Sequence, residues 1–442
     1  MVGTPRRSAV LSRGGQRIGA AALAGLIAFS APATAATAAP ARPLTGPVSV
    51  LTEPSISGDT VRADQWHLNA LRLTEAWNYA NGAGVTVAVL DSGVDAHHLD
   101  LEGQVLPGLD LVDKQGDGES DPVGHGTSVS AFIAGRNDDQ AGVVGIAPKA
   151  KILPVRVLDN KNRYDDALIV AKGVRWAVDN GADVINLSLG GSGASATLAA
   201  AIDYAFAKDV VVIACTGNAS GTSTQKTTNV GVWYPAREPG VIAVGGTERD
   251  GEGLWTGSMR GSETVVTAPA TDLVGARPDG YWRVQGTSFA SPMVAGTAAL
   301  IRSRWPDMPA SEVVNRIIRT AQDRGAPGRD AEFGFGLVDP VGALTADVTY
   351  AADNPLDNTP SPGVAKFGSA PSPGQAQSAP EESTKPDGDA SPVPGGNTGA
   401  WATPVDPAPT GVPTARWIAI LLFLLSAAAA AITIRRFAAT AG

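Results

Sequence analysis

Apolar residues follow two alternating patterns between residues 66 and 344. Short continuous apolar runs, which are typical of buried strands, occupy residues 85–90, 151–158, 183–189, 210–215 and 241–244. Stretches with helical spacing lie between these runs. An alternation of continuously apolar strands with helices predicts an α/β fold, in which helices on both faces cover a mostly parallel central sheet.

Two of the helical stretches indicate which side chains should cover this sheet. Residues 165–179 carry apolar groups at Leu168, Ile169, Lys172 (through its stem), Trp176 and Val178. Residues 194–207 are rich in alanine and place Leu198, Ile202 and Phe206 at positions i, i+4 and i+8. Such spacing gathers side chains on one side of a helix, so we expect these residues to face the strands.

The N-terminal region has the three-part pattern of an export signal. Arginines within residues 6–17 precede an apolar run of small residues at 18–29, and an Ala-Thr-Ala sequence follows at 33–35. This order predicts a cleavable secretory signal peptide. The Arg6-Arg7 pair leaves the twin-arginine export route open.

The C-terminal region has the pattern of a membrane anchor. Residues 417–434 contain no charged residue, and as a helix they would extend about 27 Å, close to one hydrocarbon thickness. Arg435 and Arg436 follow and indicate the cytoplasmic side. We therefore expect a single-pass type I protein of the plasma membrane with its globular part outside the cell. A buried core helix is disfavoured because no other apolar segment lies nearby in the sequence.

Proline is concentrated between residues 354 and 414, together with serine, glycine and aspartate. Such a segment cannot bury enough apolar surface to fold, which predicts a disordered stalk. The predicted segments are a signal peptide (1–35), an N-terminal extension (36–65), a globular domain (66–346), a Pro-rich disordered stalk (347–415), a transmembrane helix (416–436) and a cytoplasmic tail (437–442).

The composition excludes two classes of function. The chain of 442 residues carries a net charge of −9 and has no basic cluster, so it is a poor partner for nucleic acid. Its one cysteine, Cys215, rules out an intrachain disulfide and a cysteine-based metal site. Because Cys215 ends an apolar run, it is expected to be a small buried residue.

Three short motifs bring together residue types that perform acyl transfer. VAVLDSGV at residues 87–94 places Asp91 just past a buried strand, and GHGTS at 124–128 places His125 at a helix start. GTSFASP at 286–292 places Ser288 at another helix start, with Ser291 and Pro292 in the first turn. A serine hydroxyl needs a base to take its proton, histidine supplies that base near neutral pH, and a carboxylate orients the imidazole. Each motif alone is also explained as a turn or a helix cap.

The three motifs in the order Asp, His, Ser resemble those of the subtilisin-like (S8) serine peptidases over residues 66–344. The resemblance implies an extracellular serine endopeptidase that cuts polypeptides through an acyl-enzyme without a cofactor. Asp91 would be the orienting carboxylate, His125 the general base and Ser288 the nucleophile. CTGN at residues 215–218 resembles the family segment in which Asn218 would be the oxyanion donor.

NLSLGG at residues 186–191 resembles the family's edge strand that pairs with the substrate backbone. By this resemblance, the primary specificity pocket would be lined by Ser188, Leu189 and Gly190. The alternative is a strand end followed by a glycine turn, and the residues alone leave both interpretations open.

A narrower resemblance links the chain to the mycosins, subtilisin-like proteases of actinobacterial type VII secretion. It is carried by QWHL at residues 65–68, AW at 76–77 and GVTV at 84–87, together with the anchor and the stalk. It implies a type VII secretion membrane complex as partner. It also raises an alternative function, a structural subunit of that complex whose proteolysis is dispensable. Mycosins generally contain disulfide pairs, from which this chain departs.

No metal site is expected. The loop at residues 110–122 is acidic and includes Asp113, Asp117, Glu119 and Asp121, which leaves a calcium site open as an alternative, but their spacing lacks a calcium-loop pattern. We expect these acids to be solvated. His97 and His98 lack a third ligand nearby, so they are expected to be structural.

Overall fold

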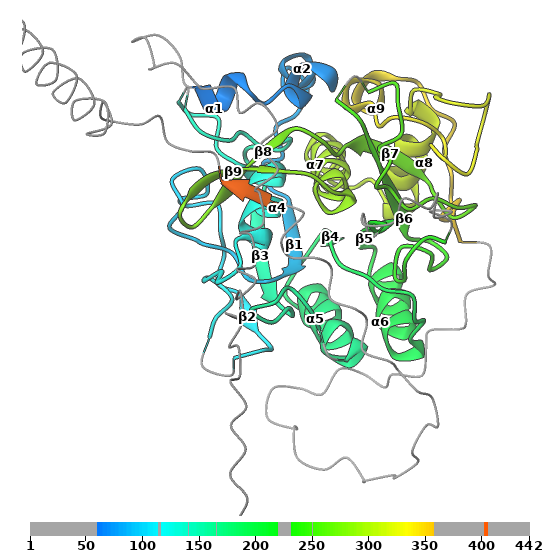
Figure 1. Cartoon of the computed structure of the whole chain (residues 1–442). Helices are drawn as coiled ribbons and strands as arrows, with labels where there is room; N and C mark the ends of the chain where they lie inside the picture. The colour runs from blue at the N-terminus through cyan, green and yellow to red at the C-terminus, as the bar shows by residue number, and fades with distance from the viewer. Residues whose placement is uncertain are drawn as a thin grey trace, which may run out of the picture. The chain divides into compact units, whose positions relative to one another are not determined.

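In the part of the chain that the structure describes, a parallel seven-stranded sheet forms the centre of the fold (Figure 1). In spatial order its strands are β2 (Leu109–Asp110), β3 (Lys151–Arg156), β1 (Thr86–Asp91), β4 (Val184–Leu187), β5 (Val211–Cys215), β6 (Ile242–Thr247) and β7 (Val266–Pro269). Every pair of neighbours in this sheet is parallel. The predicted α/β fold with a mostly parallel sheet is therefore confirmed.

The computed structural model describes residues 60–113, 116–139, 141–164, 166–219, 231–249, 251–357 and 402–404, all within one compact unit, Leu51–Gly442. The predicted signal peptide, transmembrane helix and cytoplasmic tail lie outside these residues, as do most of the N-terminal extension and the stalk. Among the helices of the described part, none is both long and apolar enough to cross a membrane.

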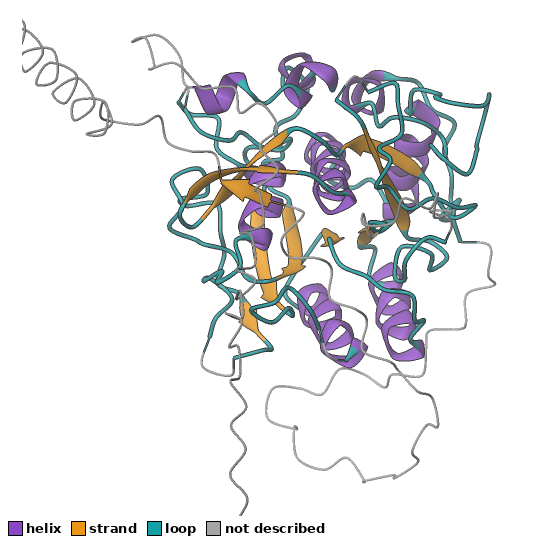
Figure 2. Cartoon of the chain, viewed as in Figure 1, coloured by secondary structure: helices purple, strands orange, loops and turns teal. Residues whose placement is uncertain are grey.

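Helices cover both faces of the sheet, as expected. On one face α4 (His125–Ala134) packs against α7 (Thr287–Arg304), and on the other α5 (Ala167–Asp179) packs against α6 (Ala196–Ala207) (Figure 2). Adjacent residues of β1 show the two faces directly. Asp91 points toward His125 at the start of α4, whereas Leu90 lies against Gly173 of α5.

Smaller elements complete the described fold. Helices α8 (Ala310–Thr320) and α9 (Pro340–Thr345) pack beside α7, and β8 (Leu273–Arg277), β9 (Gly280–Val284) and β10 (Ala402–Pro404) form an antiparallel sheet. Three short N-terminal helices are α1 (Thr60–Ala63), α2 (His67–Ala70) and α3 (Leu73–Ala76). Strand β10 lies within the segment that we expected to be disordered throughout.

The face of α5 that covers the sheet agrees only in part with the expected one, because Ile169, Trp176 and Val178 pack partly buried against the core without being the most buried residues of the helix. Its buried residues are Val170, Ala171, Gly173, Val174 and Ala177, whereas Leu168 and Lys172 are exposed. A Cβ atom at Gly173 would lie only 3.0–3.1 Å from side-chain atoms of Val157, Leu90 and Val155. The helix therefore turns its small residues inward because they allow the close approach. The expected face of α6 is confirmed for Leu198 and Ile202, which are fully buried, and Phe206 packs partly buried against the core.

The fold begins upstream of the predicted globular boundary, because residues from Thr60 onward bind the body of the domain. The Gln65 side chain donates to the Val144 carbonyl at 3.0 Å and accepts from the Val144 N–H at 2.9 Å. Arg62 Nε donates to the Gly142 carbonyl at 3.0 Å, and Asp64 pairs with Arg283 at 2.6 Å. These contacts tie the end of the N-terminal extension to the loop after α4 and to β9.

His67 of α2 is completely buried against Phe132 of α4, with ring centroids 5.4 Å apart. Neither ring nitrogen has a hydrogen-bond partner in the structure. Burial without a partner disfavours the charged imidazolium and lowers the pKa of His67 to about 3.

We expect this residue to make the domain acid-sensitive. Because the folded-state pKa lies below the ordinary value, protonation favours the unfolded chain, and stability falls as pH drops from about 6.5 toward 3. Urea titrations at pH 7.5 and 4.5 measure how far the free energy of unfolding drops between the two pH values. This drop should be smaller in His67→Phe than in the wild type, by up to about 3 kcal/mol. The exposed control His97→Gln should behave as the wild type, and equal losses in wild type and His67→Phe would contradict the assignment.

Candidate active site

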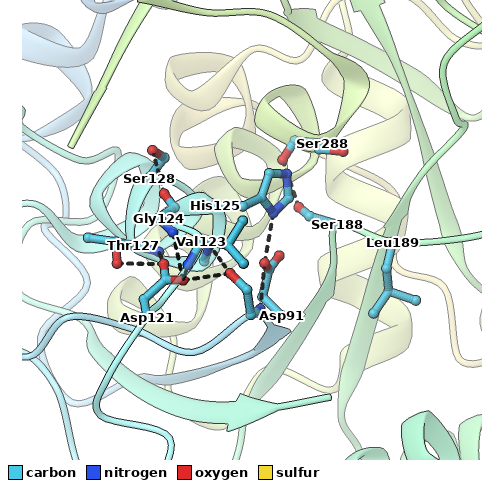
Figure 3. Close-up of polar contacts among 12 residues, drawn as sticks. Asp91, Asp121, Val123, Gly124, His125, Thr127, Ser128, Ser188, Leu189 and Ser288 are labelled. Atoms are coloured by element: carbon cyan, nitrogen blue, oxygen red, sulfur yellow. Dashed lines mark hydrogen bonds and ion pairs between the residues drawn. The ribbon is translucent and has the colours of Figure 1, made fainter. Parts of the chain in front are cut away.

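The carboxyl edge of the sheet brings Asp91 and His125 together. Asp91 is the last residue of β1, and His125 is the first residue of α4. His125 Nδ1 lies 2.7 Å from Asp91 Oδ1, and both side chains are buried (Figure 3). A carboxylate only accepts, so Nδ1 carries the proton and the Nε2 atom of a neutral ring can act as a base.

The start of α7 lies beside the same histidine. Phe289 packs on the His125 ring with centroids 5.2 Å apart, and Ser288 is the residue before it. Figure 3 draws Ser288 on the side of the ring away from Asp91. Asp91, His125 and Ser288, which the sequence separates widely, therefore lie in one region of the fold (Figure 3).

Asp121 organises the turn that presents His125, a role that the sequence analysis missed. Its carboxylate accepts hydrogen bonds from the Ser92 hydroxyl at 2.8 Å, from the backbone N–H groups of Val123, Gly124 and Thr127 at 2.7–3.0 Å, and from the Thr127 hydroxyl at 2.7 Å. Ser92 belongs to the turn after β1. Val123 and Gly124 directly precede α4, and Thr127 lies in its first turn (Figure 3). Asp121 thus fixes both ends of the Asp91–His125 pair relative to each other.

The expectation that the acids of this loop are solvated is therefore wrong for Asp121, which is buried. It holds for Asp113 and Asp117, which are exposed. A signal was present in the sequence, because an acid four residues before a helix-starting histidine can reach the free N–H groups of that helix. Within the described residues, no group of three or more His, Cys, Asp or Glu side chains could hold a metal ion.

Ser188 supports the backbone of Ser288. Pro292 lies inside α7 rather than in its first turn, because the helix already begins at Thr287. A proline has no N–H, so the carbonyl four residues earlier, that of Ser288, lacks its helical donor. The Ser188 hydroxyl donates to this carbonyl at 2.7 Å and is itself held by Asn186 Nδ2 at 2.9 Å. The hydroxyl of Ser188 therefore positions the start of α7.

Asn218 lies next to the same helix start. Its Oδ1 accepts hydrogen bonds from the Thr287 N–H at 3.0 Å and from the Thr287 hydroxyl at 2.9 Å. Two donors on Oδ1 fix the orientation of the amide, so Nδ2 is directed away from them. The left-handed φ of 147° at Gly286 lets the chain pass close to Nδ2, since a Cβ atom there would lie 3.3 Å from it.

The segment after β4 differs from the expected edge strand. Because β4 lies between β1 and β5, Asn186 and Leu187 are inside the sheet. The chain leaves the sheet after them, and Gly191 forms an antiparallel bridge with Tyr234. The prediction of an edge strand is therefore wrong for β4, which is an inner strand of the sheet. The backbone at Leu189 and Gly190 lies past the carboxyl end of β4.

Cys215 lies between this segment and α7. Its Sγ is 3.9 Å from the Ser288 Oγ and 3.9 Å from the Leu189 carbonyl oxygen. Burial raises the pKa of the thiol to about 11. The group is therefore a neutral thiol at physiological pH, and the expectation of a small buried residue is confirmed.

Comparisons with known proteins identify the family. The model of the subtilase family of peptidases, S8, matches residues 82–336. The chain belongs to this family. Subtilisin DY of Bacillus licheniformis is 40% identical over 248 residues, which cover 55% of this chain and 86% of that protein. This subtilase is accordingly a serine endopeptidase of subtilisin type, as the motifs predicted.

Solved structures of mycosins resemble this subtilase. MycP1 from the ESX-1 type VII secretion system aligns with a TM-score of 0.60 and 29% identity, covering 70% of this chain and 91% of that one. MycP3 from the ESX-3 system aligns with a TM-score of 0.58 and 32% identity, covering 68% and 92%. The narrower resemblance to mycosins is therefore confirmed.

We expect Asp121→Asn to reduce turnover while leaving the protein folded. An amide replaces one acceptor oxygen with an NH2 group that opposes the N–H and O–H donors, so the turn that holds His125 must shift. A displacement of about 1 Å can cost about 10²-fold in rate. Steady-state kinetics should show a lower kcat with a KM within a few-fold of wild type.

The matched control is Asp113→Asn, which removes an exposed acid of the same loop. It should retain wild-type kinetics. A kcat of Asp121→Asn equal to that of the wild type would contradict the positioning role of Asp121. If this variant instead shows no melting transition by circular dichroism, Asp121 is required for folding.

Proposed function

We propose that this subtilase hydrolyses peptide bonds with Ser288 as nucleophile, His125 as general base and Asp91 as orienting carboxylate. The 2.7 Å contact between Asp91 and His125 supports the proposal most directly. His125 takes the Ser288 proton as Oγ attacks the substrate carbonyl, and the carboxylate stabilises the imidazolium that forms. His125 then returns the proton to the leaving amine, which yields an acyl-enzyme that water hydrolyses.

Asn218 is proposed as the side-chain donor to the developing oxyanion. Its Nδ2 faces away from the two donors of Thr287. The Ser288 N–H is a natural second donor, because the first N–H groups of a helix have no partner within it. Donors fixed before the reaction stabilise negative charge without reorganising, which lowers the barrier.

The cleft for substrate is proposed to follow the backbone beyond β4. Ser188, Leu189 and Gly190 would form one wall, and the backbone of residues 215–217 the other. Within the first wall, Leu189 and Gly190 would contact the substrate, while Ser188 would act through its hydrogen bond to the Ser288 carbonyl. The substrate is a polypeptide, and the mechanism requires no cofactor.

The cellular role is proposed to be that of an extracellular protease of a type VII secretion system, tethered to the plasma membrane by residues 416–436. The similarity to MycP1 and MycP3, which come from such systems, supports this role. The same similarity favours a second candidate, a structural subunit of the membrane complex whose proteolysis is dispensable. A Ser288→Ala strain that secretes normally, beside a deletion strain that does not, would favour the second candidate.

Labelling and kinetics test the catalytic proposal. A serine-reactive fluorophosphonate should label the wild type at Ser288 and leave Ser288→Ala unlabelled. Asn218→Ala should lower kcat by about 10²–10³-fold, the loss known for subtilisin itself when one oxyanion donor is removed. KM should change little, because the donor acts on charge that appears only in the transition state.

The exposed control Asn69→Ala should label and turn over as wild type. Labelling of Ser288→Ala at wild-type rate, or an unlabelled wild-type protein that is folded by circular dichroism, would overturn the proposal.

A further inference from the structure

We propose that the indole of Trp233 fills the primary specificity pocket and restricts this subtilase to substrates with a small residue, glycine, alanine or serine, before the scissile bond. The inference rests on the proposed function, because it assumes that acyl transfer occurs at Ser288. It adds a substrate class and a specificity-determining residue.

The backbone around Trp233 is fixed to both walls of the proposed cleft. The Trp233 N–H donates to the Thr216 carbonyl at 2.9 Å. The next residue, Tyr234, exchanges two backbone hydrogen bonds with Gly191, at 2.8 and 2.9 Å. Trp233 is therefore held between the segment that follows β4 and the segment that ends β5.

The indole ring lies against a glycine of each wall. A Cβ atom at Gly217 would lie 2.2 Å from Trp233 Cδ2 and 2.5 Å from its Cγ. On the other wall, a Cβ atom at Gly190 would lie 3.3 Å from Trp233 Cβ and 3.5 Å from its Cε3. The two glycines leave room for the ring, and the ring occupies that room.

The side chain of the substrate residue before the scissile bond must enter this space. The attacked carbonyl carbon has to reach Ser288 Oγ while its oxygen faces Asn218, which directly follows Gly217 in the chain. The side chain one bond away from that carbon then projects between the two walls. On one wall the Ser188 hydroxyl is 2.7 Å from the Ser288 carbonyl oxygen, and on the other Cys215 Sγ is 3.9 Å from Ser288 Oγ.

The size and polarity of this space limit what it can accept. Indole is the largest side chain, so little volume remains between the walls for a second large group. Leu189, Cys215 and Trp233 carry no charge, and the neutral thiol offers no partner to a charged substrate group. A buried charge without a partner is costly, so lysine, arginine, aspartate and glutamate should be rejected as well.

A peptide series that varies only the residue before the scissile bond tests the inference. Full-chain protein in detergent is assayed with otherwise identical fluorogenic peptides bearing alanine, phenylalanine or arginine there, and active sites are counted with the fluorophosphonate. The wild type should prefer alanine to phenylalanine by at least about 10²-fold in kcat/KM, since even one methylene is worth about 10–200-fold in a tight pocket. Trp233→Gly should shift the alanine-to-phenylalanine ratio toward phenylalanine by at least about 10²-fold.

The controls separate this inference from the proposed function. Trp176→Ala removes a half-buried indole from α5 and should keep the wild-type ratio, and Trp233→Phe should give an intermediate ratio. A wild type that cleaves phenylalanine or arginine peptides as well as alanine peptides would overturn the inference while leaving Ser288 catalysis intact. The absence of both labelling and cleavage in folded wild type would instead overturn the proposed function. If Trp233→Gly does not fold, the alanine-to-phenylalanine ratios of kcat/KM in the wild type and in Trp233→Phe still test the inference.

Discussion

The hydrogen bond between Asp91 and His125 joins the sheet to the helices that carry the proposed chemistry. It connects the last residue of β1 to the first residue of α4 across 2.7 Å in a buried setting. Such a contact requires the strand end and the helix start to be placed within fractions of an ångström. Much of the surrounding structure meets this requirement, from the parallel order of β1, β4 and β5 to the packing of α4 on α7.

Backbone groups without helical partners recur around the site, and specific side chains satisfy several of them. Asp121 accepts from the N–H groups at the start of α4. Ser188 donates to the carbonyl that Pro292 leaves without a donor, and Asn218 accepts from the N–H of Thr287 at the start of α7. These polar contacts are buried or partly buried, so leaving any of them unmade would cost a desolvation penalty of about 1–3 kcal/mol. These side-chain hydrogen bonds to the backbone hold the proposed catalytic groups rigidly in place.

The sequence was sufficient for the strands that carry the site, because fully buried parallel strands are continuous apolar runs. It was insufficient for β2, β7, β8 and β9, which are short or are interrupted by glycine, proline, arginine and tryptophan. It also placed the inward face of α5 only in part, since apolar periodicity alone ignores how closely Gly173 lets the helix approach the sheet. The positioning role of Asp121 and the role proposed for Trp233 were not predicted, because both depend on contacts with residues that a local motif does not include.

The most direct test of this account is a crystal structure of the protein after reaction with a peptide phosphonate. In this peptide an alanine analogue, whose carbonyl group is replaced by phosphorus, occupies the position before the scissile bond. The account predicts a bond from phosphorus to Ser288 Oγ, a phosphoryl oxygen within hydrogen-bond distance of Asn218 Nδ2 and the Ser288 N–H, and the alanine methyl group against Trp233. A phosphorus atom bonded to another residue, or a phosphoryl oxygen that faces away from Asn218, would contradict it.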